Sequence, residues 1–199
     1  MVHSSSLPAS YFEHKYKDDI DPWRFRTSDY ERGKYDATIG ALAKKRYRHG
    51  LEVGCSIGVL TAMLSARCEQ LLAIDASPTA IAEARRSALS RVEFRVAAVP
   101  GDFPDGIFDL IVLSEVMYYF SANDLNSIAE LCVSKLSSEG EIILCHWLGE
   151  TDYPLTGHQA SDLFAAAVAT RLPSRKILHD AIYRLERLSA RASDASDAG

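Results

Sequence analysis

The segment LEVGCSIGVLT, residues 51–61, decides how the fold of this chain is interpreted. It carries an acid at Glu52 and then small residues at every second position, namely Gly54, Ser56 and Gly58. The apolar residues before Gly54 predict a strand, and those after Gly58 predict a helix. A loop of small residues between a strand and a helix is typical of a nucleotide-binding site, because a ligand can approach its backbone closely.

The spacing of these residues excludes two common nucleotide-binding motifs. The dinucleotide motif G-x-G-x-x-G, counted from Gly54, requires glycines where this chain has Ser56 and Val59. The phosphate-binding P-loop requires G-K-[ST], which this segment lacks. What remains is E-x-G-x-S-x-G, followed by Asp75 at the end of the next predicted strand. A carboxylate there can accept hydrogen bonds from both hydroxyls of a ribose, and it disfavours a 2′-phosphate.

Composition and charge narrow the class of protein. The 199 residues suit one domain, the hydrophobic fraction of 47% suffices for a sizeable core, and the net charge of −5 provides no attraction for nucleic acid. No apolar run approaches the ~20 residues of a membrane helix and residues 1–25 lack a signal-peptide core, so we expect a cytoplasmic protein without membrane insertion. The cysteines are far apart, which predicts reduced thiols and no structural zinc: Cys55, Cys68, Cys132 and Cys145.

Strand-like and helix-like segments alternate from residue 50 onward. We expect strands at 50–54, 70–75, 92–97, 108–114 and 140–147, and helices at 59–67, 77–89, 123–136 and 161–172. Residues 175–190 fit one or two strands, and their arginines equally suit a helix. This alternation predicts a mostly parallel, doubly wound α/β sheet with helices on both faces. Such sheets bind ligands at the carboxyl ends of the strands, near the point where the strand order reverses.

The N-terminal segment differs from the rest of the chain. Residues 10–47 are charged, aromatic-rich and helix-prone, and a helix from about Tyr30 to Lys45 is predicted behind a cap at Ser28 or Asp29. We expect loose ends at 1–8 and 192–199. The predicted organisation is a single domain, with a helical lid segment at 1–47, a core at 48–191 and a tail at 192–199.

The E-x-G-x-S-x-G motif and the acid at the end of strand two resemble the class I S-adenosylmethionine-dependent methyltransferases, over about Gly50 to Trp147. The resemblance implies a Rossmann-like, mostly parallel seven-stranded sheet, S-adenosyl-L-methionine as cofactor and S-adenosyl-L-homocysteine as product. It also implies that Glu52 lies near the methionyl ammonium. Ser56 stands where glycine is commoner, and as a small residue it is tolerated there.

The same resemblance implies further cofactor contacts. The segment after strand three meets the adenine edge through backbone groups, the lid segment lies over the cofactor, and an arginine there pairs with its carboxylate. The complete set of predicted cofactor residues is Glu52, Gly54, Ser56, Gly58, Asp75, Ala76, Ala98, Val99, Ser114, Trp23 and Arg32.

The segment LSEVMYYF, residues 113–120, ends strand four at the mouth of the expected site. It lacks the [DNS]-P-P-[YF] motif of methyltransferases that act on nucleic-acid amino groups, and together with the acidic charge this argues against DNA or RNA. The chain also does not reproduce the metal-binding carboxylates of catechol-type O-methyltransferases, so no metal is predicted.

The flanks carry a more particular resemblance. Residues 19–42 and 146–164 are similar to the nodulation protein S family of rhizobial N-methyltransferases. That resemblance implies methylation of the free amine on the de-N-acetylated, non-reducing-end glucosamine of a chitooligosaccharide in Nod-factor synthesis. Two alternatives stay open: a methyltransferase for another small molecule or aminosugar, and a non-catalytic nucleotide-binding partner subunit. The oligomeric state is not predicted.

Methyl transfer to an amine does not require a strong catalytic base from the protein. An amine that titrates near an α-amino group, at about 7.7–8.0, is partly neutral at cytoplasmic pH, so hydrogen-bond acceptors and alignment suffice. The candidate catalytic residues are Glu115, His146, Tyr118 and Tyr119. Aromatic faces and a few polar groups bind sugars, and the candidate substrate residues are Trp147, Asp152 and Tyr153.

Overall fold

A computed structural model describes residues 5–190 of the chain. The tail expected at 192–199 and the first four residues of the expected N-terminal loose end lie outside this range. In chain order the elements are α1 (Ala9–Asp18), α2 (Asp29–Ala41), β1 (Tyr47–Val53), α3 (Val59–Ser65), β2 (Cys68–Asp75), α4 (Pro78–Ala84), the 3₁₀ turn η1 (Arg85–Ser87), β3 (Val92–Val96), β4 (Phe108–Ser114), the 3₁₀ turn η2 (Met117–Tyr119), α5 (Ala122–Lys135), β5 (Leu136–Trp147), α6 (Gly157–Val168), β6 (Ser174–Asp180) and β7 (Tyr183–Ser189).

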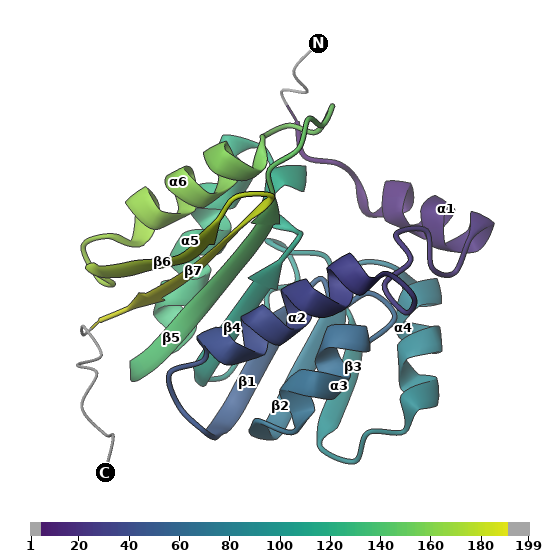
Figure 1. The fold of residues 1–199 in the computed structure, drawn as a ribbon, viewed down its shortest axis with the longest axis horizontal. Helices are drawn as coiled ribbons and strands as arrows, with labels where there is room; N and C mark the ends of the chain where they lie inside the picture. The colour runs from purple at the N-terminus through teal and green to yellow at the C-terminus, as the bar shows by residue number, and fades with distance from the viewer. Residues whose placement is uncertain (1–4, 191–199) are drawn as a thin grey trace.

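The strands form one seven-stranded sheet in the order β3-β2-β1-β4-β5-β7-β6 (Figure 1). Strands β1 to β5 pair in parallel, as the sequence predicts. β7 runs antiparallel to β5 and β6 antiparallel to β7, so the sheet is mixed at this edge and residues 175–190 belong to strands rather than a helix. The strand order reverses between β1 and β4, which places a ligand crevice at their carboxyl ends.

Helices cover both faces of the sheet, as predicted (Figure 1). Because side chains alternate along a strand, Leu51 and Leu113 pack with α5 and α6, whereas Leu110 and Val112 pack with α2 and α3. The near-continuous apolar run of β4 is buried on both faces. No helix lies between β3 and β4, where residues 97–107 form a loop.

Local capping sets where the helices begin. The Ser28 hydroxyl accepts from the Glu31 N–H at the start of α2, and Ser77 caps α4 with Pro78 in its first turn, as predicted. α6 begins earlier than predicted because Thr156 and Gln159 form a capping box.

Each of the predicted helices ends earlier than predicted, and the ends of α2 and α4 have local causes. α2 stops at Ala41 because the next backbone N–H groups turn to tertiary partners: Ala43 donates to Glu141 and Lys44 to the Tyr47 hydroxyl. α4 stops at Ala84 and passes into η1, which ends at Ala88 in a left-handed conformation.

The N-terminal segment is more ordered than predicted. Helix α1 is a separate element that the sequence did not resolve from the rest of residues 10–47. Residues 5–8, expected to be loose, are attached to the core: the Leu7 N–H donates to the Tyr119 carbonyl, and the Ser6 hydroxyl donates to Asp124.

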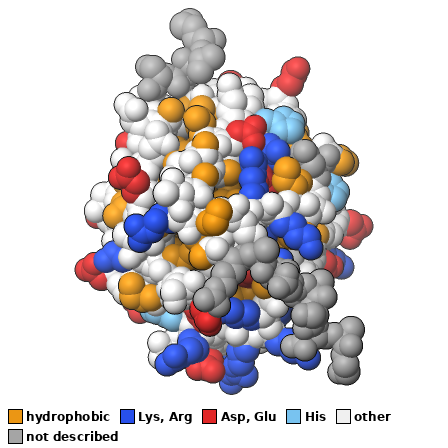
Figure 2. Space-filling model, turned by 90° about the vertical axis from the view of Figure 1, so that its left-hand side faces the viewer, with side chains coloured by type: hydrophobic (Ala, Val, Ile, Leu, Met, Phe, Trp, Pro, Cys, Tyr) orange, Lys and Arg blue, Asp and Glu red, His pale blue; other side chains and the backbone are white. Residues whose placement is uncertain are grey.

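The sheet edge at β6 is protected by charge. Figure 2 views the side of the molecule that carries this edge, and it shows Lys, Arg, Asp and Glu side chains interspersed with hydrophobic ones. Such mixing discourages edge-to-edge pairing, which matters because Ile177 and Ile182 are exposed here. None of the helices within residues 5–190 is both long enough and apolar enough to cross a membrane.

Candidate active site

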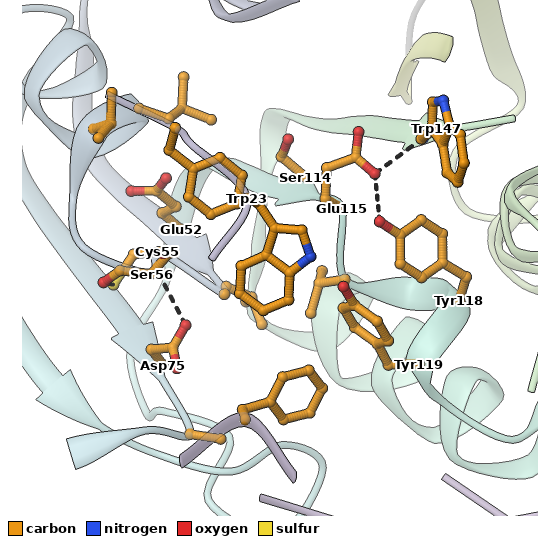
Figure 3. Close-up of a pocket in the computed structure, with 18 of the residues that line it drawn as sticks. Trp23, Glu52, Cys55, Ser56, Asp75, Ser114, Glu115, Tyr118, Tyr119 and Trp147 are labelled. Atoms are coloured by element: carbon orange, nitrogen blue, oxygen red, sulfur yellow. Dashed lines mark hydrogen bonds between the residues drawn. The ribbon is translucent and has the colours of Figure 1, made fainter. Parts of the chain in front are cut away.

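A cavity of about 320 Å³ opens at the carboxyl ends of β1, β2 and β4 (Figure 3). In Figure 3, Glu52, Ser56 and Asp75 lie on one side of it, and Glu115 and Trp147 on the other. The predicted site residues that line it are Trp23, Glu52, Gly54, Ser56, Asp75, Ala76, Ala98, Val99, Ser114, Glu115, Tyr118, Tyr119, Trp147 and Tyr153. Four predicted residues are not part of the lining: Gly58, Arg32, His146 and Asp152.

The loop after β1 explains the spacing of its small residues. Gly54, Ser56 and Gly58 all have left-handed backbone conformations, with φ values of 78°, 53° and 83°. Left-handed φ favours glycine, so alternate small residues are what this turn requires. The N–H groups of Gly54 and Cys55 both donate to the Ile74 carbonyl of β2, at 2.8 and 2.9 Å, which fixes the loop against the neighbouring strand.

Ser56 is more than a tolerated substitute for glycine. Its N–H donates to Asp75 Oδ2 at 2.9 Å, and its hydroxyl lies 2.6 Å from the Tyr16 hydroxyl, which donates to it from α1. The Ser56 side chain therefore connects the N-terminal helix to the loop.

Gly58 supports packing rather than a ligand. A Cβ added there would lie 3.2 Å from Ala84 Cβ and 3.4 Å from the Phe94 ring. Glycine is needed because α3 begins close against α4 and β3. The cofactor contact predicted for Gly58 does not fit this position.

Two buried carboxylates line the β1–β2 side of the cavity. Asp75 accepts from the N–H groups of Ser56 and Ser77, and burial raises its pKa to about 6 despite these bonds. Burial also raises the pKa of Glu52 to about 8. Glu52 Oε2 accepts no hydrogen bond from any residue in the described chain. An unsatisfied buried acceptor beside a second acid suits a ligand with a cationic group and hydroxyls.

Glu115 directly follows β4 and has a φ of 57°, a conformation that L residues rarely adopt. Its Oε1 accepts from Lys34 Nζ of α2 at 2.6 Å. Its Oε2 accepts from the Tyr118 hydroxyl at 2.5 Å and from the Trp147 N–H at 3.0 Å, the two bonds drawn in Figure 3. Glu115 therefore joins α2, η2 and the end of β5 around the cavity.

Lys34 and Glu31 complete this side of the cavity, and the sequence analysis missed both. Burial alone lowers the pKa of Lys34, but the charges of Glu115 and Glu31 raise it above the ordinary value. The available signal was helical spacing, because Glu31, Lys34, Tyr35 and Thr38 recur on the buried face of α2. Polar residues on such a face indicate a buried network.

His146 does not reach the cavity as predicted. It is fully buried, its Nε2 accepts from the Met117 N–H at 3.3 Å, and its Nδ1 lies 3.2 Å from the Ser161 hydroxyl. Burial lowers the pKa of His146 to about 4, so it is neutral at pH 7. His146 thus holds η2 from the protein interior, through the Met117 N–H, and is not placed to touch a substrate.

Three further predicted site residues are poorly placed for the ligand contacts expected of them. Arg32 faces solvent on α2, and Asp152 is exposed outside the lining. Ala98 lines the cavity, but its N–H donates to Asp102 Oδ2 at 3.1 Å and its carbonyl accepts from the Asp102 N–H at 3.0 Å. An adenine edge would have to compete with Asp102 for these groups.

Aromatic rings form much of the remaining wall. Tyr118 stacks on Tyr153 with ring centroids 5.3 Å apart, and Tyr119 meets Tyr153 edge-on. Trp23 stacks on Phe25. Burial raises the pKa values of Tyr118 and Tyr119 well above the ordinary value, so both phenols act as hydrogen-bond donors rather than bases at neutral pH.

Helix α1 closes the cavity from the N-terminal side, where Phe12 and Tyr16 contribute to the lining. Glu13 fastens it to the start of α4 by accepting from the hydroxyls of Ser77 and Thr79, each at 2.7 Å. Burial opposes ionisation of Glu13, but these bonds outweigh it and lower its pKa to about 2. Within residues 5–190, no cluster of three or more His, Cys, Asp or Glu side chains could hold a metal ion.

Comparisons with known proteins agree with this arrangement. The family model described as nodulation protein S (NodS) matches residues 11–151. Nodulation protein S of Rhizobium tropici is 35% identical over 114 residues, which cover 56% of this chain and 46% of that protein. The Sinorhizobium fredii relative is 32% identical over 127 residues, covering 62% and 59%. The matched region thus spans about half the length of these relatives.

Solved structures share the fold. A putative methyltransferase from Pseudomonas syringae is 32% identical with a TM-score of 0.71, covering 80% of this chain and 98% of that one. NodS from Bradyrhizobium japonicum WM9, solved with S-adenosyl-L-homocysteine, is 20% identical with a TM-score of 0.73, covering 88% and 96%. At that identity it shows the fold alone.

The strand order, the small-residue loop after β1 and the acid at the end of β2 define the class I methyltransferase fold. Within this class, the chain belongs to the nodulation protein S family.

The packing at Gly58 predicts a loss of stability on substitution. Gly58→Ala should lower the free energy of unfolding by about 1–3 kcal/mol, because it adds a left-handed alanine and a tight contact of 3.2 Å with Ala84 Cβ. Gly33→Ala is the matched control: Gly33 lies inside α2 with nothing within 4 Å of an added Cβ, so it should be neutral or slightly stabilising. Urea unfolding followed by circular dichroism measures both, and equal stability of the two variants would contradict the packing role.

Proposed function

We propose that this chain is an S-adenosylmethionine-dependent N-methyltransferase that methylates the free amine of the de-N-acetylated, non-reducing-end glucosamine of a chitooligosaccharide, as in Nod-factor synthesis. One observation carries the proposal. A chain of the nodulation protein S family has two buried carboxylates, Glu52 and Asp75, facing a cavity at the carboxyl ends of β1 and β2.

The residues of the β1–β2 side fit the cofactor. Glu52 Oε2 is a buried acceptor that a methionyl ammonium would satisfy. Asp75 is positioned to accept from ribose hydroxyls in addition to its two backbone donors. Gly54 lets the amino-acid moiety approach the loop backbone. When bound, S-adenosylmethionine supplies an electrophilic methyl group.

The chain's own residues contribute alignment and exclusion of water more than proton transfer. With S-adenosylmethionine bound, the amine lone pair would form a C–N bond as the C–S bond of the sulfonium breaks, and the methylated ammonium would then lose its proton to water. The phenols of Tyr118 and Tyr119 stay neutral, and both Glu115 oxygens already accept hydrogen bonds. A strong base is therefore not part of the proposed mechanism.

Other acceptors and roles remain distinct hypotheses. Another small molecule or aminosugar would use the same cofactor side and differ in its contacts with the aromatic wall. A non-catalytic partner subunit would bind the cofactor without transferring its methyl group. Our proposal also places the enzyme in the cytoplasm and excludes nucleic acid as a substrate, in line with the acidic charge of the chain.

Cofactor binding should release protons at pH 7. Glu52, with a pKa of about 8, is mostly protonated there, and an ammonium beside it lowers that pKa and expels the proton. Asp75, with a pKa of about 6, is already mostly ionised and contributes little. Calorimetry of S-adenosylhomocysteine binding in buffers of different ionisation enthalpy should show release of most of a proton.

The matched variants are Glu52→Gln and Glu69→Gln. Glu52→Gln should remove most of the proton release, whereas Glu69→Gln, which changes an exposed acid of β2, should leave it unchanged. Undiminished release in Glu52→Gln would show that the ammonium is bound elsewhere.

The acceptor should be a free amine, because acetylation delocalises the nitrogen lone pair. Label from radioactive S-adenosylmethionine should enter a terminally deacetylated chitooligosaccharide, and not the fully N-acetylated one or small phenols. The rate should rise with pH as the amine deprotonates, near about 7.7–8.0, and then level off. Methylation of the fully acetylated oligosaccharide would overturn the amine assignment, and cofactor binding without transfer to any acceptor would favour the partner-subunit hypothesis.

A further inference from the structure

The side of the cavity formed by α2 and β4 holds two carboxylates and one ammonium. Lys34 Nζ lies 2.6 Å from Glu115 Oε1 and 3.0 Å from both oxygens of Glu31. The three side chains are largely buried, with 2% of Lys34, 11% of Glu31 and 14% of Glu115 exposed. With both carboxylates ionised, the group carries a net charge of −1 in a place that water reaches poorly. Burial raises the pKa of Glu31, and a cationic partner beside it would favour the ionised form.

Glu31 is the carboxylate of this group with a vacant acceptor position. Both oxygens of Glu115 are engaged, by Lys34, Tyr118 and the Trp147 N–H. Lys34 donates to Glu31 Oε1 and lies 3.0 Å from Oε2 as well, but no described residue makes a hydrogen bond of regular geometry to Oε2, which is buried, and Glu31 lines the cavity. An ionic contact with one ammonium leaves a carboxylate oxygen with a further lone pair, which can accept a hydrogen bond from a ligand.

Aromatic rings line the same cavity as this acid. The Tyr30 ring lies 5.1 Å from Lys34 Nζ and, like Trp147, is 37% exposed, so both rings are accessible to a ligand that enters the cavity. Tyr118 is held beside them by its bond to Glu115. Polar acceptors next to aromatic faces suit a sugar that carries an amine. In Figure 3, Glu52 and Asp75 lie across the cavity from Glu115, the partner that Glu31 shares through Lys34.

We propose that Glu31 binds the acceptor amine, with Oε2 accepting one of its N–H bonds while Tyr30 and Trp147 contact the sugar ring. This inference rests on the proposed function. A hydrogen bond from the amine to Glu31 leaves the nitrogen lone pair free to attack the methyl group. As the C–N bond forms and the C–S bond breaks, the nitrogen becomes positive, and the carboxylate then stabilises a charge that the neutral reactant lacks.

The test uses Glu31→Gln, which keeps the shape of the side chain and removes its charge. The kcat/KM for a terminally deacetylated chitooligosaccharide should fall roughly ten- to a hundredfold, the value of a hydrogen bond to a charged group. Binding of S-adenosylhomocysteine by calorimetry should change by less than about twofold, since the cofactor acids are untouched. Asp29→Asn, an exposed acid in the same turn of α2, is the matched control and should leave both values unchanged.

A second readout separates amine recognition from a structural effect of losing a partner of Lys34. A fully N-acetylated chitooligosaccharide, added as a competitor, should inhibit wild type and Glu31→Gln equally, because it binds only through its sugar rings. Glu31→Asp keeps the charge beside Lys34 but withdraws the carboxylate by one methylene. Glu31→Asp should show the same selective loss of kcat/KM for the deacetylated oligosaccharide, to a smaller degree. This variant also provides the test if Glu31→Gln does not fold.

The outcomes distinguish this inference from the proposed function. Unchanged kcat/KM in Glu31→Gln, with amine methylation intact in wild type, overturns the role of Glu31 alone. Equal losses of cofactor affinity and of acetylated-competitor binding also overturn it, because they indicate a structural role. Absence of transfer from wild type to any amine overturns the proposed function and this inference together.

Discussion

The hydrogen bonds of the Glu115 carboxylate hold the cavity together. Glu115 follows β4 in a left-handed conformation and accepts hydrogen bonds from Lys34 of α2, from Tyr118 of η2 and from the N–H of Trp147 at the end of β5. Such a backbone conformation costs about 1–3 kcal/mol and persists only where the surroundings fix it. Removing one partner of a buried ion pair costs about 3–5 kcal/mol, so these contacts can hold Glu115 in place.

This arrangement divides the cavity by charge. Four carboxylates contribute to the lining, Glu31, Glu52, Asp75 and Glu115, and Lys34 is the basic residue that faces them among the lining residues described. A cavity with this excess of acid disfavours phosphates and favours ligands with ammonium groups and hydroxyls. Asp75 on the β1–β2 side and Glu115 on the α2–β4 side have separate hydrogen-bond partners. Residues on one side can therefore be substituted to suit another ligand without altering the hydrogen bonds of the other side.

The sequence predicted those parts of the structure that local patterns encode. The strands around Gly54 and Asp75, and the cap at Ser28, follow from periodicity and turn chemistry. The role of Lys34 could not be predicted so directly, because its partner Glu115 lies far along the chain. His146 was assigned to the cavity because it lies near a strand end, whereas strand alternation places it with Ile142 and Leu144, on the face beneath α6.

Ser56 stands where glycine is the commoner residue, and its side chain makes a contact that glycine could not make. A left-handed serine costs roughly 1–2 kcal/mol more than a glycine would. A net hydrogen bond contributes about 0.5–1.5 kcal/mol, so the bond from Tyr16 offsets much of that cost. The contact does what a glycine cannot: it connects α1 to the loop, and through the Ser56 N–H to Asp75. Movement of α1 away from the cavity must therefore break the bond from Tyr16 to Ser56, the residue whose N–H donates to Asp75. The hydroxyl of Ser56 thus couples the N-terminal helix to the β1–β2 side of the cavity, alongside the bonds of Glu13 to Ser77 and Thr79.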